Sequence, residues 1–179
     1  MRFISTLHCE TAWNLEGRLQ GQIDTDLHDI GIAHAHKKSL AFQQGQWHIA
    51  RIVSSDLKRT IQTAQIINTY LNVPHEIDAR LRECCYGSLQ GLSKSELTVK
   101  YPTWNDSFLS YDYRSVGGEC REDVIKRQHE VLIDLQHVYH SEDILIVGHG
   151  TSMNTLFSAL GMPNLPIRRD EIRVLTYEK

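Results

Sequence analysis

Short apolar runs alternate along the chain with longer amphipathic segments, which is the pattern of strands followed by helices. Residues 2–7 and 49–54 are rich in β-compatible side chains, so each predicts a strand. A third strand is predicted from 75 to 81. The unbroken apolar run at 143–147 is typical of a strand covered on both faces in a parallel sheet. Residues 172–177 predict a last strand.

Helical spacing of apolar residues fills the intervals between these strands. It predicts helices over 32–42, 57–71, 118–139 and 151–160. The Ser-Ser-Asp segment at 54–56 offers side-chain oxygens to cap the second of these helices. The β-α alternation predicts an α/β fold, specifically a three-layer α/β/α sandwich with a mostly parallel central sheet.

Length and charge narrow the class of protein. The chain has 179 residues, 41% of them hydrophobic, and no repeat or linker divides it, so we expect a single domain over residues 1–179. A net charge of −3 argues against sequence-independent binding of nucleic acid, which requires a basic surface. Any site that binds an anion must therefore be a local group of residues and not a basic surface of the whole protein.

Targeting signals and disulfides are not expected. No run approaches the roughly 20 apolar residues of a membrane helix, and the amino terminus lacks the regions of a signal peptide. We expect a cytoplasmic protein that does not bind membranes. The cysteines, Cys9, Cys84, Cys85 and Cys120, form no C-x-x-C pair, so we expect reduced thiols.

Polar residues with complementary chemistry follow the predicted strands. His8 follows the first strand, and Arg59 lies early in the helix after the second. Glu83 follows the third strand and His149 the fourth. Ligands of open α/β sheets bind beyond the carboxyl ends of the strands, so one architecture brings all four together. A nucleophilic imidazole, two groups that hold phosphate oxygens and a carboxylic acid that protonates a leaving oxygen predict phosphoryl transfer through a phosphohistidine.

Other features of the sequence support or compete with this interpretation of the four polar residues. The helix starts after Ser54 and His149 are expected to add backbone N–H donors for an anion. Taken singly, a histidine at a strand end is more often structural, and an arginine or glutamate more often a solvated charge. His34 and His36 lie two positions apart, which on a helix points them to different faces, so we expect no metal site.

Five ordered blocks carry a family resemblance. They are Leu7–Asn14 with Gly17–Gly21, Ser54–Ala64, Leu81–Gly91, Gly117–Cys120 and Val147–Gly150. In this order, over nearly the whole chain, the blocks resemble the motifs of the histidine phosphatase superfamily, the phosphoglycerate mutase and acid phosphatase group. The resemblance implies a phosphoglycerate mutase-like fold.

The resemblance also implies roles for the site residues. His8 is the histidine that becomes phosphorylated, Glu83 is the proton donor, and Arg59 and His149 hold the phosphoryl oxygens. The residues expected to bind substrate are Asn14, Gln20, Gly21, Arg59 and Gly150. No metal and no organic cofactor is implied.

The opening motif departs from the family's Arg-His-Gly, because this chain has Leu7-His8-Cys9. Removing one pre-positioned donor of a transferring phosphate costs ~10²–10³ in rate, so weakened catalysis is expected. Arg18 or Arg82 is a candidate to fill the space. Cys9 matters if the backbone there requires glycine, and is otherwise a tolerated small residue.

A cysteine-based mechanism is disfavoured. The loop of cysteine phosphatases has His-Cys followed by five residues and an arginine, and here the arginine position is Leu15. Without that charge the Cys9 thiol lacks its main activating group.

The third block looks closest to the phosphoglycerate mutase version, whereas the modest stretch between Gly91 and Gly117 is more like the family's phosphatases. We therefore expect hydrolysis of a small phosphorylated metabolite, with inorganic phosphate as a product. The alternatives are a weak or inactive regulatory protein that binds a phosphate ligand, a phosphoglycerate mutase-type phosphotransferase and a protein phosphohistidine phosphatase.

Overall fold

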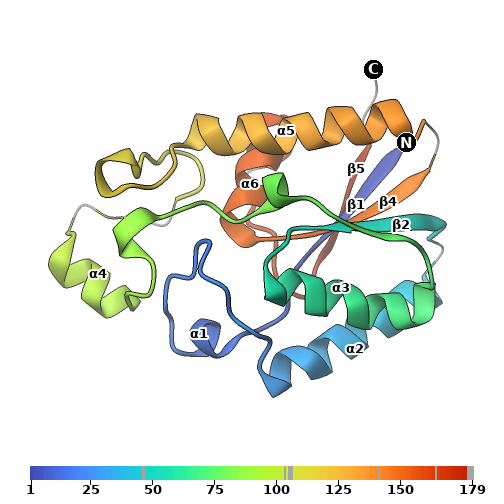
Figure 1. Cartoon of the computed structure of the whole chain (residues 1–179), viewed down its shortest axis with the longest axis horizontal. Helices are drawn as coiled ribbons and strands as arrows, with labels where there is room; N and C mark the ends of the chain where they lie inside the picture. The colour runs from blue at the N-terminus through green and yellow to red at the C-terminus, as the bar shows by residue number, and fades with distance from the viewer. Residues whose placement is uncertain (46, 103, 105–106, 141, 164, 177–179) are drawn as a thin grey trace.

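A computed structural model describes residues 1–45, 47–102, 104, 107–140, 142–163 and 165–176. Its central sheet has the strand order β3-β2-β4-β1-β5 (Figure 1). The strands are β1 (Arg2–Leu7), β2 (Ile49–Ser54), β3 (His75–Ile77), β4 (Asp143–Gly148) and β5 (Ile172–Thr176). The first four run parallel, and β5 runs antiparallel to β1 at the edge of the sheet. The predicted α/β/α sandwich with a mostly parallel sheet is confirmed.

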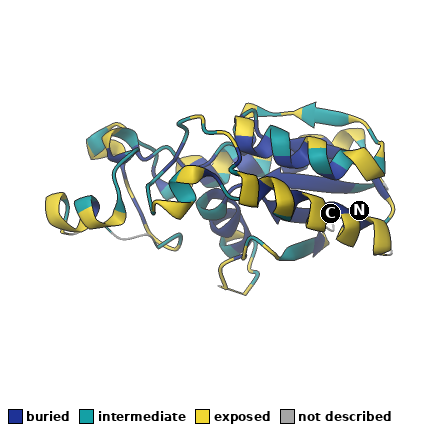
Figure 2. Ribbon diagram, turned by 90° about the horizontal axis from the view of Figure 1, so that it is seen from below, coloured by how far each residue is buried: buried dark blue, intermediate teal, exposed yellow. Residues whose placement is uncertain are grey.

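Helices cover both faces of the sheet (Figure 1). On one face pack α2 (Asp29–Gln44) and α3 (Lys58–Leu71), and on the other α5 (Arg121–Val138) and α6 (Gly150–Ala159). Successive strand residues alternate between the two layers. Phe3 and Ile144 belong to the core under α5 and α6, whereas Ile4 and Leu145 belong to the core against α2. Figure 2 accordingly shows the central strands as mainly buried and the outer helix faces as exposed, whereas the edge strands β3 and β5 are mostly intermediate.

A layer of loops and short helices lies beyond the sheet and extends the molecule on one side (Figure 1). It contains α1 (Ala12–Leu15), α4 (Lys94–Lys100) and the 3₁₀ turns η2 (Gly87–Leu89) and η3 (Arg114–Val116). Tyr86, Leu97, Tyr111 and Tyr113 give it a small apolar core of its own. This layer forms one side of the cavity described below.

Some predicted boundaries move for identifiable reasons. Helix α2 begins at Asp29 instead of residue 32, because the His28 side chain accepts from the Ile30 N–H and caps an earlier turn. The third strand ends at Ile77 instead of 81, because the Asp78 carboxylate accepts from the Arg80 N–H and starts the 3₁₀ turn η1 (Ala79–Leu81). The last strand is confirmed to Thr176, and residue 177 lies outside the described residues.

The cap predicted at 54–56 is wrong. Helix α3 has Leu57 as its N-cap residue, with no side-chain cap bond. The Lys58 N–H instead donates to a carboxylate oxygen of Asp24, in the loop that follows α1, at 2.7 Å. Within the described residues, no helix is long and apolar enough to cross a bilayer.

Candidate active site

The carboxyl ends of β1 and β4 place two histidines next to each other. Leu7 pairs with Gly148, and the His8 N–H donates to the Gly148 carbonyl at 2.9 Å. His8 and His149 are therefore the first residues beyond the paired strand ends. Their ring centroids lie 5.3 Å apart.

The His8 ring is buried and held in one tautomer. Its Nδ1 atom lies 2.7 Å from the carbonyl oxygen of Cys9, and a carbonyl only accepts, so Nδ1 carries the proton. Burial, helped by the charges of Arg59 and Arg169, lowers the pKa of His8 well below its usual value. The ring is thus neutral at pH 7 with a free electron pair on Nε2, which is the state a nucleophile requires.

Arg59 is fully buried beside the histidines. Its guanidinium donates to the carbonyls of Ile23, at 2.9 Å, and Gly21, at 2.6 Å, which fixes its plane. The buried Nε has no hydrogen-bond partner. Burial lowers the pKa of Arg59 to about 10, so the group stays charged at neutral pH. Arg59 is therefore a fixed cation that can still donate N–H hydrogen bonds to a bound anion.

Glu83 is anchored at the start of α6. Its carboxylate accepts from the N–H groups of Cys84, Thr151 and Ser152 at 2.9, 3.1 and 2.8 Å. The helix start after His149 was expected to bind the anion itself, but Glu83 takes the N–H groups of Thr151 and Ser152. Their dipoles therefore hold the acid–base candidate in place.

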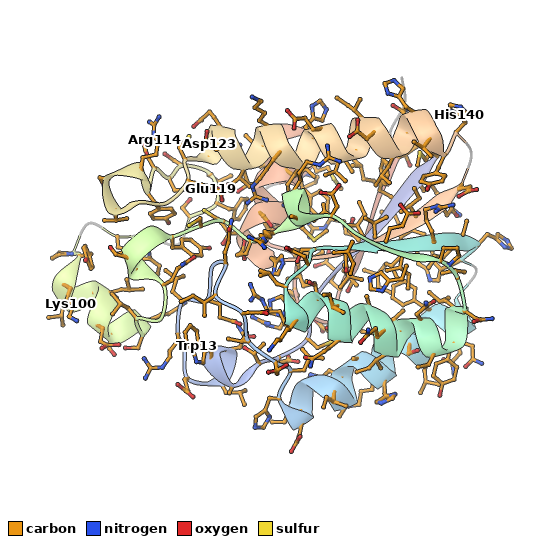
Figure 3. All side chains as sticks on the ribbon, in the orientation of Figure 1. Trp13, Lys100, Arg114, Glu119, Asp123 and His140 are labelled. Atoms are coloured by element: carbon orange, nitrogen blue, oxygen red, sulfur yellow. The ribbon has the colours of Figure 1, made fainter. Side chains whose placement is uncertain are left out.

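A salt bridge behind the loop positions Glu83. Arg127 of α5 donates to the carbonyls of Arg80 and Arg82, each at 2.6 Å, and to the Glu83 carbonyl at 3.0 Å. Its partner carboxylate, Glu119, also accepts from the Cys85 N–H at 2.8 Å. Figure 3 labels Glu119 beneath the first turn of α5. The sequence does not reveal this arrangement, because the contacts of Arg127 and Glu119 with residues 80–85 join segments far apart in the chain.

His149 lies behind the cavity and has no exposed surface. Its Nε2 is 2.7 Å from the Ser55 hydroxyl, and its buried Nδ1 has no hydrogen-bond partner. Burial, with the nearby Arg59 charge, lowers the pKa of His149 well below its usual value. The described residues that line the cavity do not include His149, so its predicted hold on a phosphoryl oxygen depends on the unpartnered Nδ1.

The cavity has a volume of about 520 Å³ and gathers the other predicted residues. Its lining includes His8, Asn14, Gln20, Gly21, Arg59, Glu83 and Gly150. Gly21 has a φ of +54°, and a side chain there would collide with Gln90, so the carbonyl that holds Arg59 depends on glycine. Thr11 and Thr25 both donate to the Gln20 side-chain oxygen. The catalytic and binding roles of these residues stay predictions.

The two arginines named as candidates for the space at position 7 are engaged elsewhere. Arg82 forms a two-bond pair with Asp56. Arg18 lines the cavity but donates to Glu16 and to the Gly91 carbonyl. Arg169, which the sequence interpretation missed, lines the cavity and donates to the Asn14 side-chain oxygen at 3.0 Å.

The cysteines offer no activated thiol next to His8. Cys9 is buried, and burial raises the pKa of its thiol, which keeps it protonated. Cys84 is also buried, and Cys120 is the buried N-cap residue of α5. The described residues hold no cluster of three or more histidine, cysteine, aspartate or glutamate side chains arranged to bind a metal ion.

Comparisons with known proteins agree with this geometry. The chain matches the family model of the histidine phosphatase superfamily (branch 1) over residues 7–177. It is 34% identical over 169 residues to the probable phosphoglycerate mutase GpmB of Yersinia pestis (strain Pestoides F), covering 93% of this chain and 78% of that protein.

Two solved structures share the whole fold. The mycobacterial glucosyl-3-phosphoglycerate phosphatase in complex with VO3 has a TM-score of 0.87 at 25% identity, over 98% of this chain and 90% of that one. YhfR of Bacillus stearothermophilus has a TM-score of 0.88 at 27% identity, over 99% and 91% of the two chains. These similarities extend over nearly the complete chain.

Proposed function

Because the chain belongs to the histidine phosphatase superfamily, we propose that it hydrolyses a small phosphomonoester through a phosphohistidine on His8. The observation that carries this proposal is the tautomer of His8, which leaves the electron pair of a neutral imidazole on Nε2. His8 shares its cavity with the charged Arg59 and the carboxyl group of Glu83. These are a nucleophile, an oxyanion ligand and an acid–base group.

The first step transfers the phosphoryl group to the protein. Nε2 of His8 attacks phosphorus, the ester P–O bond breaks, and protonated Glu83 gives its proton to the leaving oxygen. Arg59 stabilises the equatorial oxygens, on which negative charge accumulates. The new P–N bond makes the ring more positive, and the Cys9 carbonyl stabilises it through the Nδ1–H bond.

The second step releases inorganic phosphate. Water attacks phosphorus and gives a proton to the Glu83 carboxylate as the P–N bond breaks. His8 returns to its neutral form, and Glu83 is again protonated for the next cycle. No metal or organic cofactor is required, because the protein's own groups provide the nucleophile, the charge and the proton.

The proposed ligand is a small phosphorylated metabolite, and the proposed location is the cytoplasm. A cavity of about 520 Å³ accommodates a compact ester, and the net charge of −3 gives no general attraction to nucleic acid. We also propose that turnover is slower than in a pocket with an arginine at position 7, since Leu7 lines the cavity without a charge. The same feature motivates the rival, a regulatory protein that binds a phosphate ligand without turning it over.

A phosphoglycerate mutase-type phosphotransferase is the second candidate enzyme. The similarity to the probable mutase GpmB favours it. A transferase keeps the phosphoryl group on His8 until an acceptor hydroxyl arrives, whereas a hydrolase admits water. Incubation with 3-phosphoglycerate separates the two, since hydrolysis yields inorganic phosphate and mutase action yields the 2-phospho isomer.

The test uses the purified protein with para-nitrophenyl phosphate and a panel of phosphate esters, in excess EDTA. We expect release of phosphate, no release by His8→Ala, and a phosphoramidate signal in ³¹P NMR of protein denatured in alkali during turnover. Phosphate binding without release from any ester supports the regulatory rival. Equal activity of His8→Ala and the unchanged protein rejects the proposed mechanism.

A further inference from the structure

Arg169 occupies an unusual place for a charged side chain. It lies in the segment between α6 and β5 and lines the same cavity as His8, Arg59 and Glu83. It is half-buried, and its Nη1 donates to the neutral amide oxygen of Asn14 at 3.0 Å. Within the described residues it forms no ion pair with a carboxylate. Burial lowers the pKa of Arg169, and the nearby carboxylates of Glu10 and Glu83 offset this effect only in part.

Hydrogen bonds on both sides of Arg169 fix the backbone of its segment. Ile167, two residues before it, is buried and donates its N–H to the Asn154 side-chain oxygen at 2.7 Å. Two residues after it, the Glu171 carbonyl accepts from the Thr6 hydroxyl at 3.2 Å. Because β5 is antiparallel to β1, with Thr6 opposite Ile172, the start of β5 lies at the carboxyl end of β1. Arg169 is thus directed to the nucleophile's edge of the sheet.

The charges on the cavity wall are unbalanced. Arg59 and Arg169 are cations, and Glu83 is the carboxylate among the described lining residues. Arg18 also lines the cavity, but its charge is paired with Glu16. The remaining excess of positive charge sits around His8, where a phosphoryl group carries two negative charges before transfer.

We propose that Arg169 is a second arginine ligand of the phosphoryl group. Together with Arg59, it holds the phosphoryl group next to His8. This inference rests on the proposed function and adds a catalytic residue to it. Leu7 lines the cavity with an apolar side chain, so the guanidinium beside the nucleophile comes from the far end of the chain. Asn14 orients Arg169 through Nη1, and the other N–H groups of the guanidinium are available for phosphate oxygens.

The direct test compares Arg169→Met with Arg168→Met. Arg168 is the neighbouring arginine, but its side chain is 76% exposed and paired with Asp170. Isothermal titration with inorganic phosphate should show a Kd that rises about 10- to 100-fold in Arg169→Met and is unchanged in Arg168→Met. With para-nitrophenyl phosphate, kcat of Arg169→Met should fall by ~10²–10³.

A rescue variant separates phosphate contact from a structural role. Leu7→Arg places a guanidinium on the same cavity wall, so it should restore part of the activity of Arg169→Met. Its gain in the unchanged protein should be smaller, because Arg169 already supplies part of the charge that position 7 lacks. Arg169→Lys keeps the charge but not the paired donors, and should bind phosphate with intermediate affinity.

The outcomes distinguish this inference from the proposed function. Unchanged phosphate affinity in a folded Arg169→Met overturns the inference alone, and would assign Arg169 to the second cavity it lines with Cys9 and Lys38. Phosphate binding that depends on Arg169, without turnover of any ester, supports the inference and rejects hydrolysis. No phosphate binding by the unchanged protein rejects both.

Discussion

The Nδ1 atom of His8 lies 2.7 Å from the carbonyl oxygen of Cys9, and this contact sets the chemistry of the ring. A carbonyl has no proton to give, so His8 must donate, and Nε2 is left as the reactive nitrogen. The backbone of the residue that follows the nucleophile thus selects the tautomer. In many enzymes a separate carboxylate or carbonyl does this.

This contact predicts the NMR signature of the ring. In ¹⁵N-labelled protein at pH 7 without phosphate, His8 should show the neutral Nδ1–H tautomer, because burial lowers its pKa well below 6.5. The spectrum of His8→Asn assigns the signal by its disappearance. An imidazolium at pH 7, or a neutral ring protonated on Nε2, would contradict the assignment.

Stability should fall as the pH drops below 6.5. His8 and His149 have folded-state pKa values well below 6.5, whereas the unfolded chain titrates near 6.5. Between these values the unfolded state binds more protons, so their contribution is fully present above about pH 6.5. It is lost by up to about 1.4 kcal/mol per pH unit for each ring as the pH falls.

Urea unfolding between pH 7.5 and 5.5 measures this loss. His8→Asn and His149→Gln should each make the free energy of unfolding less dependent on pH in that window. His75, about half-buried, also has a lowered pKa, so His75→Asn gives the background from a ring outside the cavity. A pH dependence unchanged in both His8→Asn and His149→Gln would show that the two rings titrate normally.

Arg127→Met should damage both stability and catalysis. The change removes a guanidinium that holds the carbonyls of Arg80, Arg82 and Glu83 and leaves Glu119 without its partner. We expect a loss on the order of 3 kcal/mol in the free energy of unfolding. Displacement of Glu83 should lower kcat by about 10²-fold in the fraction that remains folded.

The matched control for that change is Arg114→Met. Arg114 forms an exposed pair with Asp112 in the outlying loop layer, as Figure 3 shows by its label. Exposed pairs contribute about 0–1 kcal/mol, so this variant should unfold close to the unchanged protein in urea. Equal losses in the two variants would mean that Arg127 acts only as a surface charge.

Gly31→Ala should destabilise the protein although the position is helical. Alanine in a helix normally gains about 0.5–1 kcal/mol over glycine. A Cβ at Gly31, however, would lie 2.0 Å from the carbonyl oxygen of Glu10, in the loop that carries His8. Steric displacement of that loop should reverse the sign, and thermal unfolding should show a lower midpoint. Ala33→Gly, at an exposed position of α2, calibrates the intrinsic preference.

Sequence patterns predicted the layers of this fold because the dominant forces there are local or periodic. The apolar run of β4 follows from burial of both faces of the strand. The helical spacing of apolar residues in α5 follows from burial of one face of the helix. The boundaries that moved, at α2 and β3, depend on single side chains such as His28 and Asp78 that cap turns. The cap of α3 was mispredicted because its acceptor, Asp24, comes from a different loop.

The candidate site was predicted except where strand direction matters. The rule that ligands bind beyond the ends of parallel strands predicted a grouping of His8, Arg59, Glu83 and His149. The structure places the first three on one cavity and His149 behind it, and their roles stay predictions. Arg169 precedes its strand. Because β5 runs antiparallel, its beginning meets the same edge that the ends of the other strands reach. Apolar patterning alone does not specify a strand's direction, so the arginine was missed.

The position of β1 in the sheet also dictates when this protein can finish folding. Strand β1 pairs only with β4 and β5 among the described strands, and both lie more than a hundred residues further along the chain. During translation β1 therefore has no partner strand until β4 is made, and pairings between such distant segments form slowly. Both neighbours of the strand that ends at the nucleophile are present only after β5 has left the ribosome.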